Sequence, residues 1–155
     1  MKFSVATQAF YANEIQYGES LPADVIDLDS EKYATLYTSI NNGSYVYLYK
    51  GELIPSEIKP DQYHSWDSSE KKWVMSEEAM IQKKNDEVNI ATEKKRQLIS
   101  EINSQTQLLQ TQLILGLISE NDKALLIDWM NYLKDIQAVD VSTAPDIIWP
   151  ASPKM

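Results

Sequence analysis

The longest regular pattern in the chain runs from Glu77 to Leu115, a stretch with neither proline nor glycine. Ser76 before it is a good N-cap residue, and Glu77 and Glu78 in the first turn offset the positive end of the helix dipole. Gly116 is a natural stop. A helix of this length would extend roughly 57 Å at about 1.5 Å per residue. We therefore predict one long helix that protrudes, breaks or lies against a partner.

Apolar side chains are unevenly spread along this predicted helix. In heptads counted from Ile81, lysines such as Lys84 and Lys95 fall on the core positions, which is weak for a coiled coil. We expect the Lys- and Glu-rich first half to be solvated or to face a partner. The second half has a better stripe, which could pack on the next helix: Leu98, Ile102, Leu109 and Leu113.

A second helix is predicted after Gly116. Ser119 and Asp122 resemble a capping box, with Asp in place of the usual Glu. The apolar face of this helix consists of Leu125 or Leu126, Trp129, Leu133 and Ile136. Beyond Ala138, prolines at 145, 150 and 153 prevent further helix. The expected shape is a helical hairpin with an extended tail.

The first half of the chain carries strand and turn signals instead. Alternation predicts a strand over residues 2–10 and a shorter one over residues 25–28. A helix is predicted from Glu31 to about Ile40, with Ser30 as its N-cap.

Two hairpins are predicted after that helix. Tyr45–Tyr49 is the clearest strand, and Lys50-Gly51 turns it into residues 52–54. Pro55 and Pro60 then bracket an irregular linker. In the second hairpin, residues 63–66 face residues 72–75.

These elements together predict an α+β protein. A small β-rich domain with one helix covers residues 1–75. A helical domain with an extended Trp-Pro tail covers residues 76–155. Each half is so short that its independent stability would be marginal, which is a first hint of a partner.

Composition narrows the environment and the partners. The net charge is −9, and up to Glu70 eleven acids stand against four bases. Such a surface repels phosphate, so nucleic acid and anionic membrane are disfavoured as ligands. The absence of cysteine fits a reducing cytosol, no signal peptide is recognised, and the longest apolar run (113–118) cannot span a bilayer. We expect a soluble cytoplasmic protein.

Candidate catalytic and metal-binding groups are few. The single histidine, His64, lies among Asp61, Ser65 and Asp67, but neighbours on one strand face opposite ways, which does not suit a triad. The segment from Asp27 resembles a calcium loop yet lacks its glycine and its bidentate Glu. The four glycines are too scattered for a phosphate-binding loop. We predict no catalytic residue, no metal and no cofactor.

Aromatic residues are the most distinctive feature of the first half. The chain has nine tyrosines and four tryptophans, and Tyr45, Tyr47 and Tyr49 share one face of a strand. Two interpretations remain open. The tyrosines could make cross-strand packing contacts, or they could form a recognition surface for a protein or a sugar.

The end of the chain resembles the tail fibre assembly proteins of tailed phages. The resemblance rests on the segment Ser119–Leu126, on Trp129, Tyr132 and Leu133, and on the run from Asp140 to Pro150 with its closing Trp-Pro. The first half is similar more loosely, through Phe10-Tyr11, Gly18, Pro22, the segment Tyr63–Asp67 and Trp73.

This resemblance implies a non-enzymatic chaperone, acting in the host bacterial cytoplasm, that binds the C-terminal tip of a trimeric fibre and promotes its folding and trimerisation. In some members the protein stays on the fibre tip. The trailing Trp149-Pro150 is expected to be a structural lock. A homo-oligomer is a further expectation, and a host-surface glycan-binding module is the alternative function. No family motif supplies the contact residues. We expect residues 1–75 to form the fibre-binding domain and its aromatic residues to make the contact: Phe10, Tyr11, Tyr45, Tyr47, Tyr49, Tyr63 and Trp66.

Overall fold

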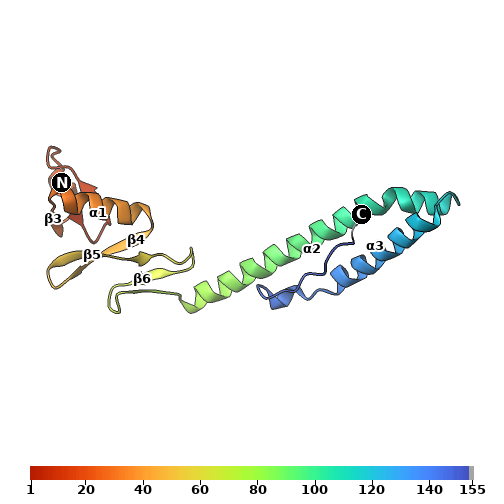
Figure 1. The fold of residues 1–155 in the computed structure, drawn as a ribbon. Coiled ribbons are helices and arrows are strands. Elements are labelled where there is room, and N and C mark those ends of the chain that lie inside the picture. Colours follow the sequence, from red (N-terminus) through yellow and green to blue (C-terminus); the bar gives the residue numbers. More distant parts are fainter. Residues whose placement is uncertain (154–155) are drawn as a thin grey trace. The chain divides into compact units, whose positions relative to one another are not determined.

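The structure is a computed structural model that describes residues 1–153. The chain forms two compact units, Met1–Met80 and Ile81–Met155. Short strands and one α-helix make up the first unit, and the second is built from long helices (Figure 1). The predicted α+β class is confirmed. The assignment of fibre binding to residues 1–75 stays a prediction.

A three-stranded antiparallel sheet opens the first unit. Its strands are β1 (Lys2–Ser4), β2 (Ala9–Tyr11) and β3 (Val25–Asp27), with β1 in the middle. The prediction of one strand over residues 2–10 is wrong, because the chain reverses between β1 and β2. Gln8 adopts a left-handed φ of 52° there, and the Ser4 hydroxyl accepts a hydrogen bond from the Thr7 N–H at 3.2 Å.

A single-turn 3-10 helix, η1 (Gly18–Ser20), and the helix α1 (Ser30–Asn41) lie on either side of β3 in the sequence. The sequence predicts Ser30 as the N-cap of α1, but the N-cap is Asp29. The Asp29 carboxylate accepts a hydrogen bond from the backbone N–H of Lys32 at 2.7 Å. Both residues are good N-caps, so the sequence pattern could not choose between neighbouring positions.

The predicted hairpin at Lys50-Gly51 joins β4 (Ser44–Tyr49) to β5 (Glu52–Ile58). Both turn residues have positive φ, 51° and 86°, as a two-residue hairpin of this type requires. The prediction of an irregular linker from Pro55 onward is wrong, since β5 continues to Ile58. Pro55 lies opposite Val46. The strand tolerates proline at this point because a non-hydrogen-bonded pair needs no N–H from it.

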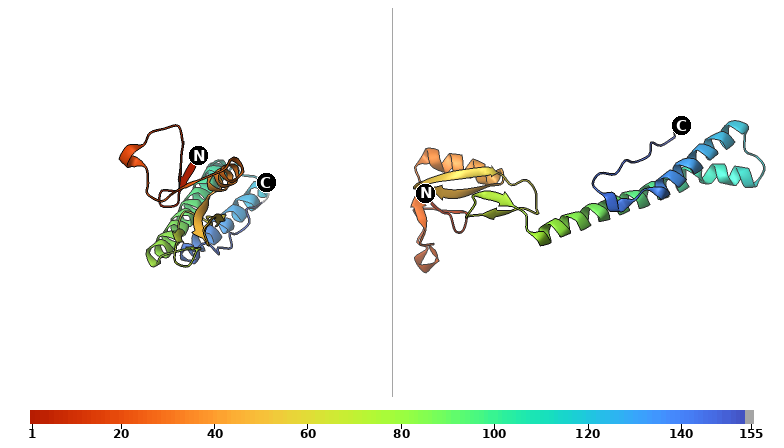
Figure 2. Two further views of the ribbon diagram at one scale, coloured as in Figure 1. Left: turned by 90° about the vertical axis from the view of Figure 1, so that its left-hand side faces the viewer. Right: turned by 90° about the horizontal axis from the view of Figure 1, so that it is seen from below.

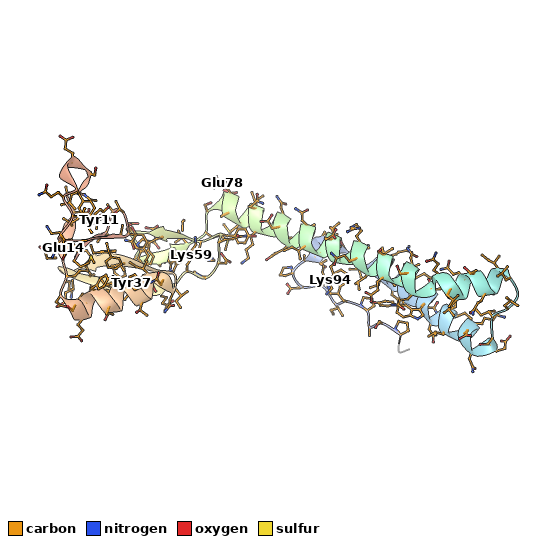
Figure 3. All side chains as sticks on the ribbon, turned by 90° about the horizontal axis from the view of Figure 1, so that it is seen from above. Tyr11, Glu14, Tyr37, Lys59, Glu78 and Lys94 are labelled. Atoms are coloured by element: carbon orange, nitrogen blue, oxygen red, sulfur yellow. The ribbon has the colours of Figure 1, made fainter. Side chains whose placement is uncertain are left out.

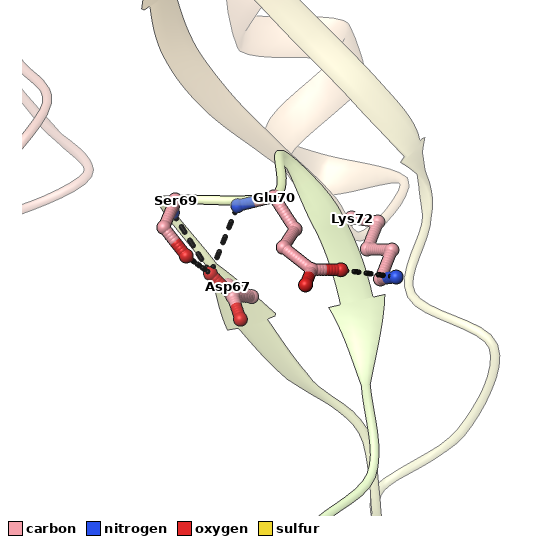
Figure 4. Close-up of polar contacts among 4 residues, drawn as sticks. All are labelled: Asp67, Ser69, Glu70 and Lys72. Atoms are coloured by element: carbon pink, nitrogen blue, oxygen red, sulfur yellow. Dashed lines mark hydrogen bonds and ion pairs between the residues drawn. The ribbon is translucent and has the colours of Figure 1, made fainter.

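The second predicted hairpin is present as β6 (Ser65–Asp67) and β7 (Lys72–Val74). One oxygen of the Asp67 carboxylate accepts hydrogen bonds from the Ser69 N–H, the Ser69 hydroxyl and the Glu70 N–H, at 2.8, 2.5 and 3.0 Å (Figure 4). Lys72 pairs with Glu70 across the same turn. The turn is thus held by its own polar side chains.

The core of the first unit forms where α1 covers the β4–β5 hairpin and the first sheet (Figure 2, right). Phe3, Leu36, Val46 and Leu53 are buried there, one each from β1, α1, β4 and β5. Each element therefore contributes one side chain to the centre.

The helix α2 (Glu77–Ile114) is unbroken over 38 residues. At its start the Ala79 N–H donates to the Ser76 hydroxyl at 3.1 Å, as the sequence predicts. At its end the Leu117 N–H donates to the Gln112 carbonyl at 2.8 Å, and Gly116 has a φ of 69°. This is the Schellman arrangement, in which a left-handed glycine satisfies the last carbonyls of a helix.

The second unit is a helical hairpin in which α3 (Glu120–Ala138) runs back beside α2 (Figure 1). Ser119 caps α3, accepting from the Asp122 N–H at 3.1 Å. Ile102 of α2 is buried against Trp129, Tyr132 and Ile136. Leu98 also packs into this core as predicted, whereas Leu113 stays half exposed (47%).

The tail that follows α3 starts with a 3-10 turn, η2 (Val141–Thr143), and then extends along α2. Lys95 of α2 donates to the carbonyls of Gln137 and Val139 at 2.7 and 2.8 Å, and Lys84 donates to the carbonyl of Ala144. The lysines that weaken the heptad pattern therefore have internal partners. Their ammonium groups donate hydrogen bonds to carbonyls that would otherwise lack a partner, at the end of α3 and in the tail.

Trp149 completes this unit. Its ring packs against the Ile102–Trp129 core. The ammonium group of Lys94, a residue labelled in Figure 3, lies 4.5 Å from the centre of the Trp149 ring. The ring thus tacks the extended tail onto α2 by apolar contact and by cation–π attraction. These contacts agree with the expectation of a structural lock.

Candidate functional site

The aromatic residues of the two hairpins form one cluster, which we call the hairpin cluster: Tyr45, Tyr47, Trp66 and Trp73. The Tyr45 ring stacks on Trp66 at 5.0 Å between centres, and Tyr47 lies 5.2 Å from the same indole. Trp73 meets Trp66 edge-on at 5.4 Å. Three of the predicted site residues are therefore brought together, and the rings of Tyr45 and Tyr47 make packing contacts with the neighbouring hairpin. The interpretation as a recognition surface stays a prediction.

Packing inside the hairpin cluster gives it a fixed shape. The Tyr45 hydroxyl reaches the Val5 carbonyl at 3.5 Å, and the Trp73 indole N–H donates to the Glu57 carbonyl at 2.9 Å. The Trp66 indole N–H is shielded from solvent and has no acceptor within the part of the chain that the structure describes. The rings are thus held by their neighbours before any partner arrives.

A surface hollow of about 530 Å³ opens beside the hairpin cluster. Its walls combine aromatic rings, two prolines and two lysines, and they come from both hairpins and the segment between them. This volume lies in the range of ligand-binding pockets. The lining residues are Tyr47, Pro55, Ser56, Glu57, Pro60, Trp66, Lys71, Lys72 and Trp73.

Tyr49 lies apart from the cluster, at the turn end of β4, and is 42% exposed. The ammonium groups of Lys71 and Lys50 lie 4.3 and 5.3 Å from its ring centre. Two positive charges over one ring restrain an otherwise open side chain.

The remaining predicted residues lie elsewhere in the first unit. Phe10 belongs to a second aromatic group, with Tyr33 at 5.1 Å and Tyr37 at 6.0 Å, and it also packs on the core. Tyr11 contacts Tyr17 at 5.1 Å and shares a hydrogen bond with Thr7 at 3.1 Å. Figure 3 marks Tyr11 and Tyr37 on this part of the chain. The predicted site residues therefore lie in several separate places in the first unit.

Tyr63 and His64 follow a local turn set by Asp61. The Asp61 carboxylate accepts from the Tyr63 N–H at 2.9 Å and lies 2.6 Å from the His64 Nδ1 atom. This geometry orders the segment before β6. It supplies an acid and an imidazole within one turn.

A partly buried glutamine, Gln8, protects the edge of β4. Because Pro55 has no N–H, the N–H and C=O of the opposite Val46 face away from β5. The Gln8 amide meets both, accepting from the Val46 N–H at 2.8 Å and donating to the Val46 carbonyl at 2.7 Å. This part of the edge is closed to strand addition by a partner.

Sequence reasoning missed Trp73, Lys71 and Gln8. Trp73 could have been found, since it lies directly opposite Trp66 in the predicted hairpin. The lysine above Tyr49 and the glutamine on β4 depend on contacts between segments far apart in the sequence. No spacing rule predicts such contacts.

The described part of the chain offers neither a cluster of metal ligands nor a membrane-spanning helix. Residues 1–153 contain no group of three or more His, Cys, Asp or Glu side chains placed to hold a metal ion. Over the same residues, no helix is both long enough and apolar enough to cross a membrane.

Comparison with known proteins places the chain in a family. The family model described as "Caudovirales tail fibre assembly protein, lambda gpK" matches residues 5–154. The chain therefore belongs to this family of phage assembly proteins, as its sequence resemblance indicates. No solved structure matches it.

Individual relatives come from phages and from Escherichia coli K12. Tail fiber assembly protein U' of Escherichia phage Mu is 29% identical over 86 residues, 54% of this chain and 48% of its own length. The tail fiber assembly protein of Escherichia phage lambda is 33% identical over 94 residues, 61% of this chain and 46% of its own. The match thus spans about half of each phage protein. Protein TfaD of Escherichia coli K12 is 26% identical over 166 residues, covering 98% of this chain and 86% of TfaD.

Proposed function

We propose that this chain is a chaperone for a phage tail fibre, which binds the C-terminal tip of the trimeric fibre and promotes its folding and assembly. The observation that carries the proposal is family membership over residues 5–154. Intertwined β-rich trimers fold slowly and expose strand edges and apolar surface on the way. A partner that covers such surfaces transiently would raise the yield of trimer. The proposal places this work in the host cytoplasm, before the particle is complete.

The first unit is the part that we expect to contact the fibre. Its preformed aromatic rings offer contact area at low entropic cost, because they are already ordered. We expect the hairpin cluster and Tyr49 to make this contact rather than Phe10, because Phe10 packs against the core of the unit. The aromatic residues of the second unit, Trp129, Tyr132 and Trp149, are engaged in its own core.

Co-expression tests the proposal directly. The cognate fibre is produced with and without this chain, and soluble trimer is measured by size-exclusion chromatography with light scattering. We expect soluble trimer to fall at least tenfold when the chain is omitted. A fibre that trimerises equally well alone would refute the chaperone function.

Point variants locate the contact. Tyr49→Ala removes an exposed ring at the proposed surface, and Tyr37→Ala removes a ring of similar exposure (50%) on α1. We expect Tyr49→Ala to weaken co-purification with the fibre and Tyr37→Ala to leave it unchanged, with circular dichroism unchanged in both. The reverse result would move the contact to α1.

The alternative function, adhesion to host-surface glycans, uses the same rings and predicts a different result. Binding of the isolated chain to a glycan array, together with normal fibre maturation in its absence, would favour adhesion. Detection of the chain on purified particles would show that it remains on the fibre tip.

A further inference from the structure

Positive charge in the first unit is concentrated around the hairpin cluster. Residues 1–80 contain thirteen acids and six lysines. Four of those lysines border the hollow or lie over rings beside it: Lys50, Lys59, Lys71 and Lys72. Two acids lie at the same surface, Glu57 in the lining and Glu70 against Lys72. Most lysines of a strongly acidic unit therefore gather at one aromatic surface.

The ammonium groups are held in place by the rings beneath them. Lys71 and Lys50 lie over Tyr49, and Lys59 lies 5.8 Å from the ring centre of Trp73. Lys50 and Lys71 both occupy tight turns, with left-handed φ of 51° and 53°. Positions fixed in this way lower the entropy lost when a ligand binds.

The turn that carries Lys71 is itself restrained. Asp67 binds Ser69 and Glu70, so the chain from β6 to β7 has little freedom (Figure 4). Lys72 is paired with Glu70, but both side chains are more than half exposed. Such a pair is weak in water, and a carboxylate of a ligand can replace Glu70 at small cost.

We propose that this hollow binds an extended, acidic segment of the fibre, in which an apolar side chain enters beside Trp66 and Trp73 while neighbouring Asp or Glu side chains meet the lysines. The inference rests on the proposed function and adds the chemistry of the bound segment. Charge complementarity is its basis: the lysines offer unpaired or weakly paired ammonium groups, and opposite charge on the ligand steers and orients binding.

A peptide suits this surface better than other anions. A nucleic acid carries phosphates far beyond the hollow and would meet the acids of the surrounding chain, which has a net charge of −9. A sugar ring stacks best on an open aromatic face. Lysines lie over Tyr49 and Trp73, and Tyr45 covers Trp66. A short segment with a few carboxylates needs only the local positive charge.

The test uses the full chain and two sets of synthetic peptides that tile the C-terminal region of the cognate fibre. One set has the native sequence, and the other has every Asp and Glu replaced by Asn and Gln. Fluorescence anisotropy measures binding. We expect native acidic peptides to bind, and their neutral versions to bind at least tenfold more weakly. We also expect added salt to narrow the difference.

Charge reversal on the protein provides the matching experiment. Lys59→Glu/Lys71→Glu should weaken peptide binding at least tenfold. The control Lys123→Glu/Lys134→Glu makes the same change in net charge in the second unit and should leave binding unchanged. Circular dichroism confirms that both variants fold. Shifts of the Trp66 and Trp73 indole N–H signals in NMR spectra would place the bound peptide at the hollow.

The outcomes separate this inference from the chaperone function. If omission of the chain abolishes soluble fibre while Lys59→Glu/Lys71→Glu still rescues it and binds all peptides as before, the acidic-segment inference is wrong and the chaperone function stands. Equal binding of the neutral peptides, or binding of an anionic oligosaccharide with no peptide bound, would also overturn the inference. A fibre that matures without the chain would remove the chaperone function itself.

Discussion

Asp67 illustrates how one side chain can set the form of a binding surface. Its carboxylate accepts hydrogen bonds from the Ser69 hydroxyl and from two backbone N–H groups, and the positive charge of Lys72 lies nearby. These interactions together lower the pKa of Asp67. Hydrogen bonds to the ionised form favour that form. The conformation of the turn, and with it the position of Lys71, therefore depends on Asp67 being charged.

This dependence predicts a pH effect with a definite sign. Because the folded pKa of Asp67 lies below its ordinary value near 3.8, its contribution to stability is present at neutral pH and is lost as the pH falls through the folded value. An NMR titration of the carboxyl carbon should show the low pKa in the native chain. Ser69→Ala, which removes the largest cause, should raise it toward the ordinary value. An unchanged pKa in Ser69→Ala would contradict the role of the hydroxyl.

Single residues also mark where local sequence rules succeed. Ser76, Gly116 and Ser119 were identified from sequence as helix caps, and the structure confirms each of them. A cap satisfies backbone groups within one turn of itself, so neighbouring residues contain all the information needed. Ser30 was predicted wrongly because Asp29 beside it caps equally well.

At the scale of elements, α2 and α3 depend on contacts that span about forty residues. Lys95 reaches two carbonyls at the end of α3, which would otherwise lack partners. No periodic pattern relates position 95 to positions 137 and 139. The sequence analysis could therefore find the two helices but could interpret Lys84 and Lys95 only as solvated or partner-facing residues.

Substitution of Lys95 tests how much its hydrogen bonds to the end of α3 contribute to stability. Lys95→Met keeps the aliphatic stem and removes the charge that binds the Gln137 and Val139 carbonyls. Hydrogen bonds from a charged donor contribute about 1.5–3 kcal/mol, and partial exposure lowers this to about 1–2 kcal/mol. Urea unfolding followed by circular dichroism should show that loss. Lys123→Met, an exposed lysine on α3, serves as the control and should change stability by less than about 0.5 kcal/mol.

Gln8 makes a corresponding contact in the first unit. Gln8→Ala leaves the N–H and C=O of Val46 without their partner, and an unsatisfied, partly buried polar group costs about 1–3 kcal/mol. We expect lower stability and faster amide hydrogen exchange at Val46, because the edge of β4 opens. Gln62→Ala changes an exposed glutamine and should leave the exchange rate unaltered. Unaltered exchange in Gln8→Ala as well would show that water replaces the glutamine without cost.

The strands were predicted less completely than the helices, for a physical reason. Residues 2–10 mix alternation with residues that favour strands, yet the left-handed Gln8 and the hydrogen bond between Ser4 and Thr7 reverse the chain in the middle. Pro55 was expected to end its strand, but it lies opposite Val46, where the pairing needs no N–H from it, and so the strand continues. Strand limits depend on pairing with distant residues, which local sequence does not specify.

For the molecule as a whole, family membership and charge support the proposal that this chain acts by binding another protein. Membership of the tail fibre assembly family covers residues 5–154, and the net charge of −9 disfavours polyanionic ligands. Of the predicted site residues, Tyr45, Tyr47 and Trp66 do form one cluster. Their role in fibre binding stays a prediction until variants are measured.

Self-association is the other prediction at this scale. Several large apolar side chains around the turn between α2 and α3 are exposed, among them Ile114, Leu115 and Leu117. Exposed apolar residues that lie close together favour protein contacts. We expect sedimentation velocity to show a concentration-dependent oligomer and Leu115→Ser/Leu117→Ser to shift it toward monomer. The exposed pair Ile15→Ser/Ile58→Ser is the control. A monomer at all concentrations would exclude the homo-oligomer.

The lock formed by Trp149 has a consequence for the order of folding during synthesis. The first unit has all its strands once residue 80 has left the ribosome, so it can fold while translation continues. In the second unit α2 can pack on α3 earlier, but the tail cannot dock until Trp149 has emerged, because Lys84 and Lys94 contact Ala144 and the Trp149 ring. A nascent chain stalled before residue 149 would thus display a finished first unit while the tail of the second is still undocked.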